Sequence, residues 1–153
     1  NINAYSHCLM TCILRQLERA IKMISKGHNK TQLEKEWLKT VVDFAESTSW
    51  LNDKYDAICN SSRFEIDHIL GARTKRKING VSRRVGELAI MPIPYELHNI
   101  KSATPLNRTL SPANYRAVFG HEKQVWLSMI NTMHMEGYEI PFDDDVINAI
   151  VKR

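Results

Sequence analysis

The sequence predicts an α+β fold, mainly helical, in which a two-stranded hairpin and a short helix are embedded among about six helices. Apolar residues recur at three- and four-residue spacing through most of the chain, which is typical of amphipathic helices. The period changes to two over residues 64–70, and a short apolar run follows at 88–92. We therefore expect a strand, a loop, a second strand and a short helix in the middle of the chain.

Three helices are predicted before the first strand. Residues 6–26 carry apolar residues on one face, and Gly27 is a stop signal. Thr31 and Glu34 form a capping box that opens a second helix. A third helical segment covers 49–59, with its aromatic and aliphatic residues facing inward.

The central segment alternates strands with a basic stretch. Gly71 ends the first strand, and residues 72–86 are predicted to form a long loop with Asn79-Gly80 as its turn. The second strand covers 88–92. Pro94 then suits the first turn of a short helix that runs to about residue 101.

Three further helices are predicted after this segment. Ser111 and Pro112 open one that stops at Gly120, and residues 122–136 form the next. The aspartates at 143–145 suit the start of a last helix, which we favour over a metal-binding loop. We expect an N-terminal helical region over 1–60 and a second region over 61–153, packed as one compact unit.

Composition excludes several classes of protein. The chain has 153 residues, of which 43% are hydrophobic and 25% charged, as in ordinary soluble globular proteins. Its uncharged stretches are shorter than the roughly 20 residues of a membrane-spanning helix, so we expect no membrane association. Three cysteines without Cys-x-x-Cys spacing argue against a disulfide framework and a zinc knuckle. We expect a reducing, cytoplasmic location.

Positive charge is concentrated in one segment. The net charge is +4, yet residues 71–108 alone hold eight basic and two acidic residues, a local excess of +6. Such a patch attracts polyanions through counterion release, although a solvated loop is the alternative interpretation. The candidate phosphate contacts are Arg73, Lys75, Arg76, Lys77, Arg83, Arg84 and Lys101.

Three residues of this segment can supply hydrolytic chemistry. Asp67 and His68 come at the end of the first strand, and His98 lies in the short helix after the second. If the strands pair, Asp67 and His98 converge and can share a divalent cation. His68 points to the opposite side of the strand, where a neutral imidazole can act as a general base.

These residues carry a resemblance to a known family. Ile66-Asp67-His68-Ile69, followed by Leu88, Pro92-Ile93 and His98-Asn99, resembles the ββα-metal core of HNH (His-Me finger) endonucleases, in particular the phage branch related to the recombination-enhancement nuclease Ref. Glu87-Leu88 matches an acidic-Leu step of that branch, and residues 115–126 match its downstream helix. The resemblance covers about half of the chain, residues 63–137.

The resemblance implies specific roles. Asp67 and His98 would be metal ligands, His68 the general base, and Glu87 a supporting residue or a further ligand. The metal would be Mg²⁺ or Mn²⁺, with Zn²⁺ also compatible with these ligands. Two more candidates are Asn99, as an additional ligand, and His121, as a phosphate contact or a helix cap.

The resulting hypothesis is a metal-dependent DNA endonuclease of phage or bacterial recombination or DNA processing, whose N-terminal helices pack on the finger or mediate a homodimer. The first alternative is an HNH-derived module that binds nucleic acid or protein without cutting. It is favoured by Ala89, which stands near a position where HNH enzymes often have Asn. The second alternative is a helical interaction protein with incidental charge. The form of the substrate stays open.

Overall fold

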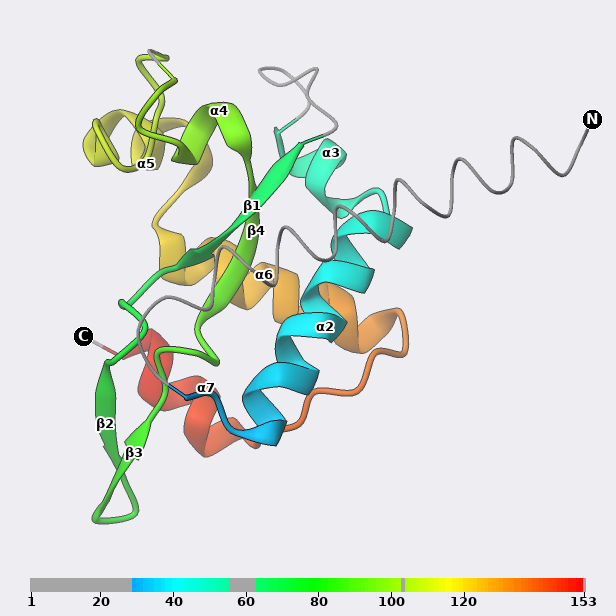
Figure 1. The fold of residues 1–153 in the computed structure, drawn as a ribbon, viewed down its shortest axis with the longest axis vertical. Helices are drawn as coiled ribbons and strands as arrows, with labels where there is room; N and C mark the ends of the chain where they lie inside the picture. The colour runs from blue at the N-terminus through cyan, green and yellow to red at the C-terminus, as the bar shows by residue number, and fades with distance from the viewer. Residues whose placement is uncertain (1–28, 56–62, 103, 153) are drawn as a thin grey trace, which may run out of the picture.

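The computed structural model describes residues 29–55, 63–102 and 104–152 and has an α+β, mainly helical fold (Figure 1). Its helices are α2 (Gln32–Ser47), α3 (Trp50–Tyr55), α4 (Tyr95–His98), α5 (Pro112–Phe119), α6 (Glu122–Met135) and α7 (Asp144–Val151). Its strands are β1 (Phe64–His68), β2 (Lys75–Ile78), β3 (Val81–Arg84) and β4 (Ile90–Pro94). The predicted helix over 6–26 lies outside the described residues.

Strand β4 runs through the centre of the molecule. It pairs antiparallel with β1, with Asp67 opposite Met91 and His68 opposite Ile90. All of β4 is buried, because α2, α3 and α6 pack against it while β1 covers one edge (Figure 1). The helices that cover the β1–β4 pair therefore come from both sides of it in the sequence: α2 and α3 precede β1, and α6 follows β4.

Aromatic residues fill the core between these helices. Trp37 of α2 and Trp126 of α6 are fully buried, and both contact Phe142, at ring-centroid distances of 5.0 and 6.3 Å. The Trp37 indole also donates a hydrogen bond of 2.9 Å to the carbonyl of Leu88, just before β4. The N-terminal helix α2 is thus fixed to the strand that leads into α4.

The prediction of a long loop over 72–86 was wrong. Strands β2 and β3 occupy this stretch and pair antiparallel, separate from the β1–β4 pair. Asn79 and Gly80 form its two-residue turn with φ angles of 50° and 79°, as a type I′ hairpin turn requires. The high density of basic residues led to the loop prediction, but the aliphatic parts of Lys and Arg side chains can pack on a sheet as well as in a loop.

The second strand and its helix also begin and end differently from the prediction. The strand covers Ile90–Pro94 instead of 88–92, and Pro94 caps α4 instead of starting it. Two prolines are tolerated because β4 has a single described sheet partner, β1, so its other edge needs no amide donors. The helix ends at His98, short of residue 101.

The remaining helix predictions are confirmed within the described residues. The capping box is formed, with the Thr31 hydroxyl accepting from the Glu34 amide and the Glu34 carboxylate accepting from the Thr31 amide. Asp143 caps α7 through its side chain, which accepts from the Val146 amide. The aspartate run therefore begins a helix, as predicted. Of the predicted segment 49–59, the described part forms α3.

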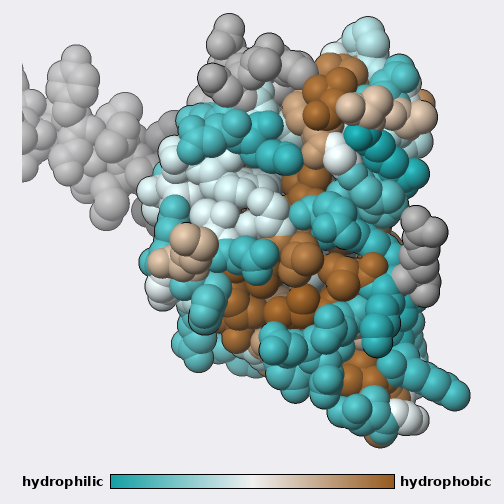
Figure 2. All heavy atoms as spheres, turned by 180° about the vertical axis from the view of Figure 1, so that it is seen from behind, coloured by the Kyte–Doolittle hydropathy of each residue, from teal (hydrophilic) through white to brown (hydrophobic). Residues whose placement is uncertain are grey.

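The outer surface is mixed in character. Figure 2 shows the face turned away from the viewer of Figure 1, where apolar side chains form an area surrounded by hydrophilic ones. Among the residues described, no helix has the length and apolar character needed to cross a bilayer.

Candidate functional site

Asp67 of β1 and His98 of α4 lie side by side. The Nε2 atom of His98 is 3.3 Å from Oδ1 of Asp67, whose side chain is 3% exposed. The short helix brings His98 there because the chain passes from β4 directly into α4 and Leu97 anchors that helix in the core. The predicted convergence of these two residues is present in the structure.

Glu65 fixes the orientation of His98. Its carboxylate lies 2.6 Å from Nδ1 of His98 and accepts a hydrogen bond of 3.0 Å from the side-chain amide of Asn99. Burial lowers the pKa of His98, but hydrogen bonds to Asp67 and Glu65 outweigh burial and raise that pKa above its usual value. Glu65 and Asp67 are two residues apart on a strand, so both face α4.

Arg108 is the second positive partner of Asp67. Its guanidinium donates to Oδ1 of Asp67 and, at 3.2 Å, to Oε1 of Glu122. Arg116 completes this group by donating to Glu122 at 2.8 and 3.0 Å. Burial raises the pKa of Glu122, but the bonds from Arg116 outweigh it and the pKa falls to about 2.

His68 belongs to a separate group on the other side of β1, as the strand period predicts. Its Nε2 atom is 3.2 Å from Oε2 of Glu87, and the same oxygen is 2.8 Å from the ammonium of Lys30. Burial raises the pKa of Glu87, but hydrogen bonds from His68 and Lys30 outweigh it and lower the pKa to about 2. Glu87 is therefore ionised at neutral pH.

Asp67 and His98 have donor atoms that fit a divalent cation. The Oδ2 atom of Asp67 is buried and has no hydrogen-bond partner among the described residues. The two atoms that face each other are Oδ1 of Asp67 and Nε2 of His98, 3.3 Å apart. They would suit two adjacent positions of a coordination sphere once Nε2 gives up the proton in its hydrogen bond to Asp67, with water and phosphate oxygens completing the sphere. Within the described ranges, no group of three or more His, Cys, Asp or Glu residues is arranged around such a point.

The two additional candidates have structural roles in the hydrogen-bond network. Asn99 supports Glu65, and its side-chain oxygen accepts from the Lys101 amide at 2.9 Å. His121 is the N-cap of α6, where its Nδ1 accepts from the Lys123 amide at 3.3 Å. The cap role of His121, one of the two predicted alternatives, is the one seen.

The predicted phosphate contacts differ in their surroundings. Arg84 is bound to Glu34 of α2, with its Nε atom 2.8 Å from Oε1. Arg76 is half-buried and donates to the carbonyl of Lys75 at 3.1 Å. The exposed members of the set are Arg73, Lys75, Lys77, Arg83 and Lys101.

Sequence reasoning did not select Glu65, Arg108 or Lys30. A signal existed for Glu65, because carboxylates at positions 65 and 67 of one strand must share a face. No comparable signal existed for Arg108, which reaches Asp67 from a loop 41 residues further along the chain. Lys30 precedes the capped helix α2 and meets Glu87 only through tertiary packing.

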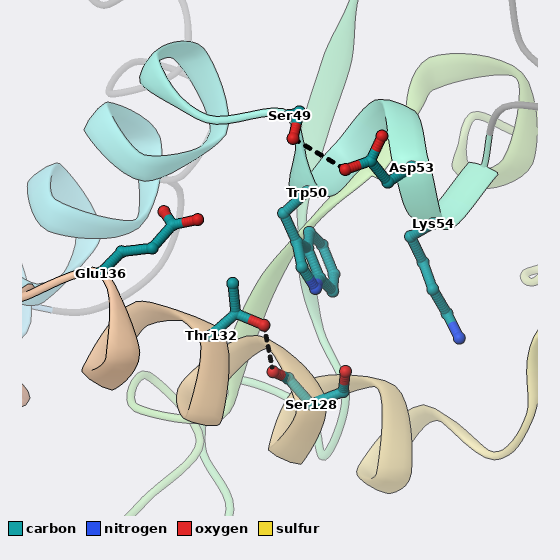
Figure 3. A pocket seen from close by; sticks show the side chains of 7 residues that line it. All are labelled: Ser49, Trp50, Asp53, Lys54, Ser128, Thr132 and Glu136. Carbon is teal, nitrogen blue, oxygen red and sulfur yellow. Dashed lines mark hydrogen bonds between the residues drawn. The ribbon is translucent and has the colours of Figure 1, made fainter.

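A surface hollow lies away from these groups. It has a volume of about 350 Å³ and is lined by residues of α3, α6 and the turns beside them: Ser49, Trp50, Asp53, Lys54, Ser128, Thr132 and Glu136. In Figure 3 the Ser49 hydroxyl bonds to Asp53, at 2.7 Å, and the Thr132 hydroxyl to the Ser128 carbonyl. Both hydroxyls are thus occupied locally, and none of the predicted site residues lines this hollow.

Comparisons with known proteins identify no relative of this chain. No protein-family model matches the sequence, and neither a curated protein nor a solved structure is significantly similar to it.

Proposed function

We propose that the chain is a metal-dependent DNA endonuclease of the ββα-metal, HNH type. The observation that supports this most is the position of Asp67 and His98, 3.3 Å apart where the antiparallel β1–β4 pair meets α4. This order of two strands and a helix, with an acid on the first strand and an imidazole on the helix, is what the family resemblance implies.

In this proposal Asp67 and His98 would hold the divalent ion. When bound, the ion stabilises the negative charge that develops on the phosphate and on the departing 3′-oxygen. Glu65 accepts a hydrogen from Nδ1 of His98 and so keeps Nε2 directed toward Asp67. Carboxylates commonly orient metal-ligating histidines in this way.

We assign His68 the role of general base, which requires the scissile phosphate to lie at the end of β1, where the side of His68 and the side of Asp67 meet. Its Nε2 is held by Glu87, so Nδ1 is the nitrogen left to take a proton from the attacking water. Oxygen of that water bonds to phosphorus as the bond to the 3′-oxygen breaks. The ionised Glu87 stabilises the imidazolium that forms, and Lys30 fixes the position of Glu87.

One observation favours the alternative, a binding module that does not cut. Arg108 donates to the same oxygen of Asp67 that faces His98, so a guanidinium already neutralises this carboxylate. A nuclease requires Arg108 to share or release Asp67 when the ion binds. A module without catalysis keeps this pair intact.

A nicking assay separates the two functions. Supercoiled plasmid is incubated with Mg²⁺ or Mn²⁺ and the parent protein, His68→Ala or His134→Ala, where His134 is an exposed control on α6. Loss of a general base lowers rates by about 10²–10⁴-fold. We expect that loss in His68→Ala, with unchanged DNA binding, and parental rates in His134→Ala.

Two results contradict the nuclease. One is equal cutting by the parent and His68→Ala, which indicates contaminating activity. The other is no cutting of single-stranded, duplex or branched DNA by the parent with either ion. Salt-dependent DNA binding in that second case supports the module instead.

A further inference from the structure

The β2–β3 hairpin is a regular ribbon that extends from the body of the protein (Figure 1). Near its base, Arg84 is bound to Glu34 of α2. At its turn, the side chain of Asn79 donates to Asp145 of α7 at 3.1 Å, and Ile78 is buried. Contacts at both ends fix the direction of the hairpin before any partner binds.

Charge on this hairpin is of one sign. Residues 73–84 include six basic and no acidic residues. Lys75, Lys77 and Arg83 are exposed, and no carboxylate in the described part of the chain pairs with them. Arg76 and Arg83 are directly opposite each other in the ladder, an arrangement that destabilises a sheet by like-charge repulsion. Binding to a polyanion removes that repulsion.

We propose that the β2–β3 hairpin is the element that binds duplex DNA, by entering the major groove with its exposed cations against the flanking phosphates. This deepens the proposed function by naming the form of the substrate. A strand of four residues is about 13 Å long, since each residue adds about 3.3 Å. The major groove of B-DNA is about 12 Å wide and admits a two-stranded ribbon.

The composition of the hairpin argues against other polyanions. The major groove of duplex RNA is too narrow and deep for side chains to read, so this ribbon does not fit it. Proteins that bind single strands stack bases on aromatic side chains, and residues 73–84 contain none. A membrane surface would also require aromatic or large apolar anchors, whereas Val81 is the exposed large hydrophobic residue here.

Binding measurements test this in EDTA, so that neither a metal ion nor cleavage is involved. Fluorescence anisotropy compares labelled duplex DNA, single-stranded DNA and duplex RNA of one sequence and length. The test variant is Lys75→Gln/Lys77→Gln/Arg83→Gln. Its control, Lys35→Gln/Lys39→Gln/Lys152→Gln, removes the same charge from exposed positions on α2 and beyond α7.

We expect the parent to bind duplex DNA more tightly than either competitor. Each lost phosphate contact reduces the steepness of log K against log salt concentration by about 0.9, so the slope of the test variant should be smaller by about 2.7. Its binding near 0.1 M salt should be weaker by roughly 10²–10³-fold. The control should lose less than threefold. Ser82→Glu, which adds an acid opposite Lys77 and removes no cation, should also weaken duplex binding.

Equal weakening by the test and control variants would overturn the proposal, as would parental affinity for single-stranded DNA or duplex RNA that matches the affinity for duplex DNA. Circular dichroism of each variant checks the fold. Binding to anionic vesicles that the test variant abolishes, with no preference for duplex DNA, also overturns it. Because cleavage is not measured, failure of the nuclease proposal leaves this test intact.

Discussion

Substitution of Glu122 by Gln tests the buried ion-pair group next to Asp67. The Glu122 side chain is 5% exposed and bonds to Arg116 and Arg108 at 2.8–3.2 Å. Its pKa of about 2, against an ordinary 4.5, means that folding favours the ionised form. The folded and unfolded pKa values differ by about 2.5 units, and each unit corresponds to about 1.36 kcal/mol. The ionised Glu122 therefore contributes at most roughly 3 kcal/mol to the free energy of unfolding at neutral pH. Arg116 is 46% exposed, so solvent screening reduces the expected loss to about 1–2 kcal/mol.

The pH dependence of the stability difference shows whether ionisation of Glu122 is its cause. A lowered carboxyl pKa stabilises the fold above pH 4.5, and this stabilisation is lost as pH falls from about 5 toward 2. Urea unfolding should therefore show Glu122→Gln less stable than the parent at pH 7, with only about a quarter of that difference left at pH 2.5. Glu139→Gln, at an exposed position, should match the parent at both pH values. Equal stability of Glu122→Gln and the parent at pH 7, or a difference that is as large at pH 2.5 as at pH 7, refutes the reasoning.

Three other substitutions test the structure around the site. In Gly86→Ala, the new Cβ would lie 2.1 Å from the carbonyl oxygen of Gly71. We therefore expect urea unfolding to show a loss of about 3 kcal/mol or more in the free energy of unfolding, and the adjacent Glu87 carboxylate to be poorly positioned. A variant as stable as the parent would contradict this close approach. Tyr115→Phe leaves the buried Tyr55 hydroxyl without its 2.7 Å partner and should cost about 1–3 kcal/mol, while the double Phe variant should recover part of that loss. Thr31→Ala removes the cap of α2 and should lower the free energy of unfolding by about 1 kcal/mol; Thr31→Ser should not.

Local sequence patterns predicted the elements whose determinants are adjacent in the chain. The capping box at Thr31 and Glu34 marked the start of α2, and the alternation after Phe64 marked β1. The helix containing His98 was found, but its first residue was misplaced. Pro94 suits both a helix start and the end of a strand with one free edge, and only the pairing with β1 decides between them.

Tertiary contacts explain what the sequence did not reveal. The hairpin over 75–84 depends on its Asn79-Gly80 turn and on support from α2 and α7, which a count of charges cannot show. The sequence correctly predicted that Asp67 lies beside His98, because β1 pairs with β4 and β4 continues directly into the helix that carries His98. Its pairing with Arg108 depends on how a loop after α4 folds back, with the Arg108 amide bonded to the Leu97 carbonyl at 2.7 Å.

The most direct test of the central claim is the anomalous scattering of Mn²⁺ in a crystal of the protein. We predict a peak about 2.0–2.3 Å from a carboxylate oxygen of Asp67 and from Nε2 of His98, with Arg108 displaced from Oδ1 or sharing that oxygen. A crystal at saturating Mn²⁺ that shows no peak there, with Arg108 still paired to Asp67, would contradict a metal centre at this position.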